Sequence, residues 1–313
     1  MSKVKIYKAE GYGAHYRSVE ELAEQQSIVA DDVTDIKGSK PSAAGLLISK
    51  LKNNALDCNV FMISDSTGDA VDEWTYLMAE SLAVKYPVYS VDFYYWDNTG
   101  DTGYDTPISI STGTGDNTLS IYCAAKSGSR PDYFMGGRFQ AAVVDIPQCD
   151  LVVFNHGHNI GEGDDERLYP INQMLESIFS VVSYHNGCGV IVSSQNPKRD
   201  SDFGAVIYEG LVTVAGICNA DITDSYTVFE SLGKDPIYYT DNTHPNALGN
   251  SEILLPSIMR QLESTQPKSA VSPLDDNTFN YLVNGDFSNF SGSTPSNWSN
   301  ANATCTKNTT NFE

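Results

Sequence analysis

The sequence has few basic residues and no long apolar run. Lys and Arg together number 19 against 40 Asp and Glu, which gives a formal net charge of −21 and a pI near 4.4. Because nucleic-acid phosphates require a basic face, this balance argues against a DNA or RNA partner and disfavours anionic membranes. No apolar run reaches membrane-spanning length, and the first residues lack the apolar stretch of a secretory signal. We therefore expect synthesis in a cytoplasm and no membrane insertion.

The six cysteines form no CxxC pair. Cys123 and Cys188 lie inside apolar, strand-like runs. This placement predicts buried free thiols rather than a disulfide framework or a zinc site.

Between about residues 58 and 265, expected strands alternate with expected helices. This order predicts a three-layer α/β/α domain with a mainly parallel sheet. The Gly- and Thr-rich stretch 98–118 is expected to be an inserted hairpin or a long loop. The expected strands are 59–64, 88–96, 119–125, 151–156 and 188–194, and the expected helices are 70–86, 169–185 and 250–264.

The two flanks differ from this central region. Residues 1–57 are expected to be a helical oligomerisation segment or linker, with a heptad-like apolar seam from Val19 to Ile36 that contains Gln26. A coiled coil and an ordinary amphipathic helix remain alternatives for this seam. Residues 266–313 are rich in Asn, Ser and Thr, and we expect a linker followed by the start of a β-rich module.

Reactive residue types follow the expected strands, where the active sites of α/β sheets gather. Ser66 follows strand 59–64 and is expected to precede a helix directly, although Ser, Asp and Thr also cap helices. Gly128 and Asn159 follow two further strands, and Asp241 lies three residues before His244. A serine that attacks a carbonyl needs a base, a carboxylate that orients the base, and donors for the oxyanion. The chain supplies all of these groups in one order.

These four stretches resemble the SGNH (GDSL-type) hydrolase family. Ser64-Asp65-Ser66 matches the family's Gly-Asp-Ser block, with serine in place of glycine. Gly157-His158-Asn159-Ile160 matches Gly-x-Asn-Asp, with isoleucine in place of the final aspartate, and Asp241-Asn242-Thr243-His244 matches Asp-x-x-His. The resemblance covers about residues 58–265.

The resemblance implies a flavodoxin-like sheet and a role for each matched residue. Ser66 would be the nucleophile, His244 the base and Asp241 its orienting acid. The Ser66 and Gly128 N–H groups and the Asn159 side chain would form the oxyanion hole, with Ser127 as an alternative to Gly128. No cofactor or metal is implied. His156 and His158 with Asp164, Asp165 and Glu166 would be a metal site in a different interpretation.

Within the family, "DST" followed by "GHN" looks more like the rhamnogalacturonan acetylesterase branch than the lipase branch. We therefore expect hydrolysis of O-acetyl esters on a polysaccharide, with His158 and Arg130 as candidate substrate-binding residues. The net charge disfavours dense polyanions unless Arg130, Arg138, Arg167 or Arg199 offsets it locally. An SGNH lipase or acylhydrolase is the first alternative.

The flanks also look like those of a bacteriophage tail fibre or tailspike. The start without a signal, the short helical segment and "LVNGDFSN" at 282–289 are the features concerned. This resemblance implies a homotrimer in a phage virion that acts on host surface glycan. A catalytically silent receptor-binding protein is the second alternative.

Overall fold

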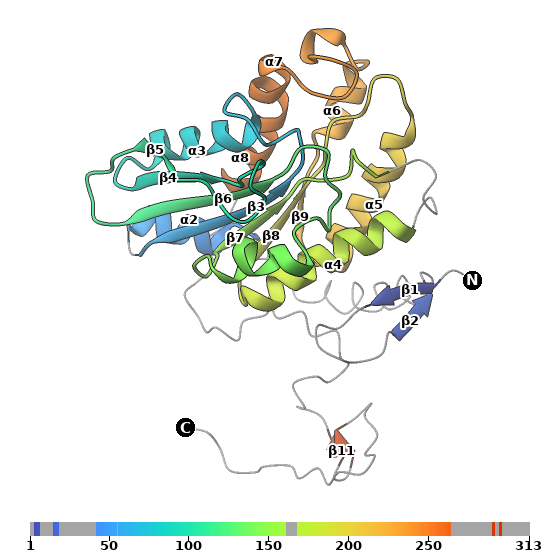
Figure 1. Cartoon of the computed structure of the whole chain (residues 1–313), viewed down its shortest axis with the longest axis horizontal. Helices are drawn as coiled ribbons and strands as arrows, with labels where there is room; N and C mark the ends of the chain where they lie inside the picture. The colour runs from blue at the N-terminus through green and yellow to red at the C-terminus, as the bar shows by residue number, and fades with distance from the viewer. Residues whose placement is uncertain are drawn as a thin grey trace. The chain divides into compact units, whose positions relative to one another are not determined.

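A seven-stranded sheet forms the centre of the larger part of the chain (Figure 1). The computed structural model describes residues 3–6, 15–18, 42–54, 56–160, 168–263, 290–291 and 294–295. The chain divides into two compact units, Met1–Val271 and Ser272–Glu313, and each is described by itself. None of the described helices has the length and apolar character needed to cross a membrane.

The sheet has the strand order β5-β4-β6-β3-β7-β8-β9. All neighbouring strands pair in parallel except β5, which lies antiparallel to β4 at one edge. Ranked along the chain, the parallel strands β4-β6-β3-β7-β8-β9 have the order 2-3-1-4-5-6, and the same ranking without β4 is the 2-1-3-4-5 order of flavodoxin-like folds. The strands are β3 (Cys58–Ser64), β4 (Ser90–Tyr95), β5 (Ile108–Ser111), β6 (Thr118–Ala125), β7 (Leu151–Phe154), β8 (Gly189–Ser193) and β9 (Asp221–Thr223).

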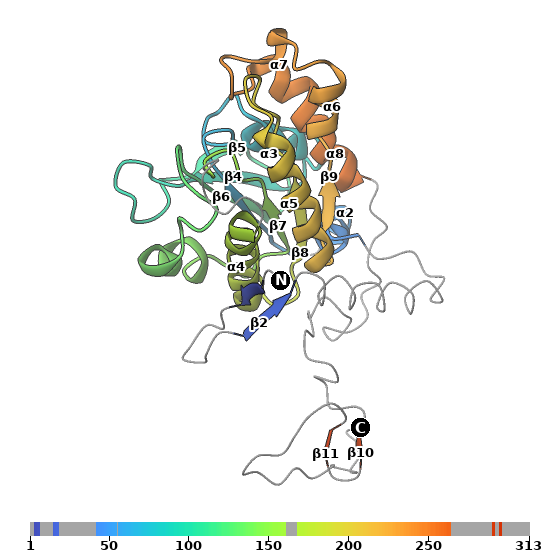
Figure 2. The same cartoon turned by 90° about the vertical axis from the view of Figure 1, so that its right-hand side faces the viewer.

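Helices cover both faces of this sheet, with α3 and α8 on the opposite face from α4 and α5 (Figures 1 and 2). The α-helices are α2 (Gly45–Asn53), α3 (Trp74–Lys85), α4 (Leu168–Tyr184), α5 (Phe203–Ile217), α6 (Tyr226–Ser231), α7 (Ala247–Gly249) and α8 (Leu255–Glu263). Short 3-10 helices η1 (Gly136–Arg138) and η3 (Pro236–Tyr238) and π-helical turns η2 (Gln140–Val144) and η4 (Asn250–Leu254) connect them.

The alternation of side chains along β3 explains why the central strands read as nearly continuous apolar runs. Val60 and Met62 belong to the core cluster that includes residues of α2, α3 and α8. Phe61 and Ile63 are equally buried but point to the other face of the sheet. A parallel strand covered on both faces needs apolar residues at every position.

The expected fold is confirmed, and the expected strands and helices are present with small shifts at their ends. The structure corrects one expectation close to the candidate site. Helix α3 begins at Trp74 rather than at residue 70, so Ser66 does not directly precede a helix. Asp65 and Ala70 accept turn-forming hydrogen bonds from the N–H groups of Gly68 and Glu73, and these turns occupy the interval.

Some elements were not expected from the sequence. Helices α5 and α6 and strand β9 are additional, and α5 contains glycines and β-branched residues of low helix propensity that packing against α4 supports. The stretch 98–118 contains a loop followed by β5, which pairs antiparallel with β4 at the edge of the sheet, so it combines features of both expected alternatives.

The flanking segments are only partly described. In the segment 1–57, α2 buries Leu47, Ile48 and Leu51 in the domain core, and β1 (Lys3–Ile6) and β2 (His15–Ser18) form an antiparallel pair. The seam between residues 19 and 36 lies outside the described residues. Within 266–313, β10 (Phe290–Ser291) and β11 (Thr294–Pro295) form another antiparallel pair. The domain boundaries therefore stay predictions.

The five cysteines in the described part of the chain are all buried and free. This result agrees with the expectation of reduced core thiols. Burial raises the pKa of Cys58 to about 12 and of Cys188 to about 12, so these thiols are poor nucleophiles.

Candidate active site

The turn that carries Ser66 begins directly after β3. The side chain of Asp65 accepts hydrogen bonds from the backbone N–H and the hydroxyl of Thr67, at 3.1 and 2.9 Å. A Cβ atom at Gly68 would lie 2.5 Å from Ser64 Oγ, so only glycine fits at this position. Ser66 itself is half-buried, and its hydroxyl is left to face the next group.

That group is His244, which the fold brings from the other end of the domain. Ser66 Oγ lies 2.9 Å from His244 Nε2, and His244 Nδ1 lies 2.8 Å from Asp241 Oδ2. With Nδ1–H donating to the carboxylate, Nε2 is free to accept the serine proton. The three residues therefore form a continuous hydrogen-bonded chain, as the sequence predicted.

Asp241 is held ionised by local hydrogen bonds. Its Oδ1 accepts from the backbone N–H groups of Thr243 and His244 at 2.6 and 2.7 Å. These bonds, with the His244 side chain, lower the pKa of Asp241 to about 2. The side chains of His244 and Asp241 are 36% and 55% exposed, so the site is open to solvent.

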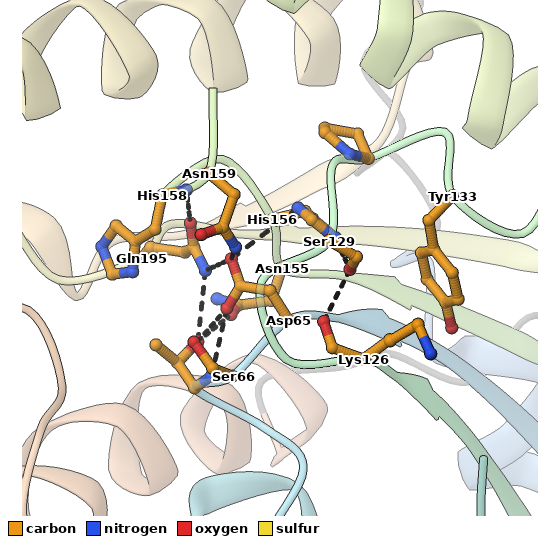
Figure 3. Close-up of polar contacts among 12 residues, drawn as sticks. Asp65, Ser66, Lys126, Ser129, Tyr133, Asn155, His156, His158, Asn159 and Gln195 are labelled. Carbon is orange, nitrogen blue, oxygen red and sulfur yellow. Dashed lines mark hydrogen bonds and ion pairs between the residues drawn. The ribbon is translucent and has the colours of Figure 1, made fainter. Parts of the chain in front are cut away.

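A buried carboxylate, Asp65, lies next to Ser66 (Figure 3). Asp65 is fully buried, and its Oδ2 accepts from Gln195 Nε2 at 2.9 Å and from Asn159 Nδ2 at 3.4 Å. Burial by itself would raise the pKa of Asp65, but His156, His158 and the donated hydrogen bonds outweigh it and lower the pKa. Asp65 is therefore a carboxylate that links the Ser66 turn to Asn159.

Asn159 lies in a tight turn after β7. Gly157 has a φ of 151°, and a Cβ at that position would lie 2.4 Å from a methyl carbon of Ile207, so glycine is required. Ile160 is buried and its N–H donates to Gly157 O at 3.0 Å. The loop is thus held by this turn and by the burial of Ile160, which stands where the Gly-x-Asn-Asp block has its final aspartate.

Gly128 lies in the turn from Lys126 to Ser129, next to the serine turn. The parallel register places Ala125 opposite Ser64, and the Lys126 N–H donates to Ser64 O at 3.3 Å. Gly128 has a φ of 70° and is exposed, with open space where a Cβ would be. These features suit a backbone N–H that faces a ligand.

Ser127, the alternative donor, is also exposed on this turn. Gly128 and Ser127 therefore stay alternatives for the third oxyanion donor, and the positive φ of Gly128 is the feature that distinguishes the two.

The two candidate substrate-binding residues are placed differently. His158 is buried, and its Nε2–H donates to Asn196 O at 2.6 Å, which favours a structural hydrogen bond over contact with substrate. Arg130 is exposed on the loop after Gly128 and stays a candidate.

His156 is also buried, and burial lowers its pKa to about 4, so it is neutral near pH 7. Its Nε2 lies 3.3 Å from Ser129 Oγ, and its Nδ1 lies 3.7 Å from Asp65 Oδ2 (Figure 3). Among the described residues, no group of three His, Cys, Asp or Glu side chains is arranged to hold a metal ion. Asp164, Asp165 and Glu166 lie outside the described residues.

Sequence reasoning missed Gln195 and Asn196, which follow β8 and contact the serine turn, the Asn159 loop and the loop of His244. Their position after a predicted strand was the available signal. However, two amides in a polar loop match no sequence motif. Their hydrogen-bond partners are far away in the sequence, so the sequence does not reveal them.

Comparison with known proteins finds a related enzyme and solved structures that are similar to this chain. No protein-family model matches the chain. A rhamnogalacturonan acetylesterase of Emericella nidulans is 29% identical over 194 residues, covering 48% of this chain and 79% of that protein.

A solved structure shares the fold. A two-domain esterase active on acetylated mannans matches with a TM-score of 0.52 and 14% identity, covering 74% of this chain. The chain spans 56% of the length of that esterase. A lipase/acylhydrolase from Enterococcus faecalis matches with a TM-score of 0.46 and 15% identity, covering 68% of this chain and 100% of that one.

Proposed function

We propose that this chain is a carboxylic ester hydrolase of the SGNH type, a serine esterase that removes O-acetyl groups from a polysaccharide. The observation that carries the proposal is the hydrogen-bonded chain from Ser66 through His244 to Asp241, at 2.9 and 2.8 Å. The Asn159 amide and the Gly128 turn lie after β7 and β6, the two strands that pair with β3. This set of groups suits acyl transfer to a serine.

The proposed reaction has two steps. Ser66 Oγ attacks the acetyl carbonyl carbon while its proton passes to His244 Nε2, and the ester C–O bond then breaks as His244 returns the proton to the departing sugar oxygen. In the second step His244 takes a proton from water, the water oxygen attacks the acetyl-serine, and acetate leaves as Ser66 recovers its proton. Asp241 keeps the imidazole oriented and stabilises its charged form.

The charge that develops on the carbonyl oxygen needs hydrogen-bond donors. We assign this role to the Ser66 and Gly128 N–H groups and to Asn159 Nδ2. Within the described residues, the hydrogen bond of Asn159 Nδ2 is a long one of 3.4 Å to Asp65. A donor held by a weak internal bond is ready to bind an oxyanion without losing a strong partner.

The acetylated-carbohydrate substrate is supported by the relatives and by the surface near the site. The two relatives that carry weight are an acetylesterase for rhamnogalacturonan and an esterase active on acetylated mannans. His244 and Asp241 lie exposed, which suits a polymer that is approached at its surface.

Local charges favour a neutral or weakly charged glycan. Arg138 is paired with Asp101, so it offsets little of the charge of −21. Arg199 donates to Lys234 O and lies 5.8 Å from the centre of the Tyr239 ring, and these uncharged partners leave its positive charge in place. Arg167 lies outside the described residues.

Turnover of p-nitrophenyl esters tests this proposal against the lipase alternative. We expect the acetate to be cleaved far faster than the octanoate or palmitate, and acetate to be released from O-acetylated polysaccharide. A rate that rises with acyl chain length would favour the lipase. No turnover of any ester would favour the silent receptor-binding alternative.

We further propose that the protein is a homotrimeric component of a phage tail that acts on host surface glycan. The support is the Val19–Ile36 seam and the "LVNGDFSN" stretch. Both lie outside the described residues, and the short strands β10 and β11 follow the second of them. Light scattering on the full chain tests it, and a monomeric mass would contradict the trimer.

A further inference from the structure

Two buried amides lie directly after β8 and have no role in the proposed reaction. Gln195 is 4% exposed and Asn196 is 2% exposed. Burying a side-chain amide costs folding free energy unless the amide is hydrogen-bonded. The partners lie in three stretches that come from different parts of the chain.

Gln195 joins the serine turn to the Asn159 loop. Its Nε2 donates to Asp65 Oδ2 at 2.9 Å and to Thr67 Oγ1 at 3.1 Å. Its Oε1 accepts from the backbone N–H of His158 at 2.7 Å. Asp65 and Thr67 flank the nucleophile, and His158 immediately precedes the oxyanion amide. Figure 3 shows the Gln195 side chain between His158 and Asp65.

Asn196 joins the same loop to the loop of the catalytic histidine. Its Nδ2 donates to the backbone carbonyl of Thr243 at 2.6 Å. Its own backbone carbonyl accepts from His158 Nε2 at 2.6 Å. Thr243 immediately precedes His244, so this contact fixes the backbone from which the base projects.

We propose that Gln195 and Asn196 are positioning residues that hold the nucleophile, the oxyanion amide and the base in register. The inference rests on the proposed esterase function. The three groups are carried by separate loops, and no regular element spans all of them. Reaction rates fall steeply when reacting groups are misplaced by about 1 Å. The two amides supply short, buried connections among these loops.

The two amides have separable effects. Gln195 contacts Asp65 and His158, and it therefore affects the oxyanion site. Asn196 contacts Thr243, and it therefore affects the orientation of His244. A residue with only a structural role would lower stability without changing the turnover of each folded molecule.

The test uses Gln195→Met, which keeps the volume and removes the hydrogen bonds, and Asn196→Ala. The matched control is Gln148→Met, because Gln148 is an exposed glutamine before the amino end of β7, whereas the site lies at the carboxyl ends of the strands, and its Nε2 donates to Asn186 O at 3.0 Å. Turnover of p-nitrophenyl acetate is measured per active site, and a serine-directed organophosphonate counts the active sites. This count removes any misfolded fraction.

We expect kcat per active site to fall by about 10- to 100-fold in both variants, with KM changed less than about three-fold, and no change in the control. In double mutants, Gln195→Met with Asn159→Ala and Asn196→Ala with Asp241→Asn are each expected to lose less than the product of the single losses. If Asn196→Ala does not fold, Asn196→Asp keeps the shape while replacing the donor to Thr243.

Several outcomes would overturn the proposal. Wild-type kcat per active site in the variants, an effect confined to KM, or multiplicative losses in the double mutants would each do so. A wild-type protein that neither cleaves the ester nor reacts with the organophosphonate would overturn the esterase function itself, and the positioning role with it.

Discussion

Ser66 Oγ and His244 Nε2 lie 2.9 Å apart although 178 positions separate the two residues in the sequence. Ser66 follows the central strand β3, and His244 precedes the short helix α7 near the end of the domain. Their approach depends on the whole sheet between them. The following predictions test this geometry and its surroundings.

We expect Ser66→Ala and His244→Ala each to lower kcat by several orders of magnitude, because either change breaks the proton path. The readout is p-nitrophenyl acetate hydrolysis. Circular dichroism and thermal melting serve as the control for folding. Near-normal turnover by Ser66→Ala would exclude this residue as the nucleophile.

Asp241→Asn is expected to be milder than His244→Ala, because Asn196 still holds the loop of His244. The pKa of Asp241 is lowered to about 2 in the folded protein from 3.8. The ionised carboxylate therefore stabilises the folded state fully above pH 3.8, and this effect is lost only as the pH falls toward 2. A rate profile from pH 4 to 9 should therefore show no inflection from Asp241. A loss equal to that of His244→Ala would contradict the expected order.

Asn159→Ala should lower kcat by about 10²- to 10³-fold with little change in KM, as for loss of one oxyanion donor. Steady-state kinetics on p-nitrophenyl acetate separates the two constants. An effect on KM alone would instead make Asn159 a residue that binds substrate.

Gly128→Ala should lower kcat because φ at this position is 70°, which alanine adopts poorly. Gly128→Asn should retain more activity, since asparagine tolerates this conformation better. Gly137→Ala is the matched control, because Gly137 also has open space around its Cβ position but no positive φ. Equal activity in all three variants would argue against Gly128 as a donor.

Glu73 is expected to limit stability at alkaline pH. Burial raises its pKa to about 8 from 4.5, so the folded state holds the proton more tightly than the unfolded chain. The contribution of Glu73 to the free energy of unfolding is complete below pH 4.5 and is lost as the pH rises through about 8. Glu73→Gln should therefore match the wild-type Tm at pH 4.5 and exceed it by roughly 2–5 °C at pH 9. A Tm difference that is independent of pH would contradict this assignment.

The sequence by itself determined the fold class and the candidate reactive groups. Strands buried on both faces leave long apolar runs such as "NVFMIS", and the residue types after those runs limit the chemistry that they can perform. Ser66, Asn159, Asp241 and His244 were identified together, because each alone is weak evidence and their order along the chain is what resembles a hydrolase family.

Only the tertiary structure decided which groups meet and what supports them. The strand order places the carboxyl ends of β3 and β7 side by side, and this pairing brings Asp65 to Asn159. The same packing places the His158 side chain against Asn196 O and gives Gln195 and Asn196 their partners. These contacts join residues that are far apart in the chain, and hydrogen bonds of this kind leave no period or spacing in the sequence.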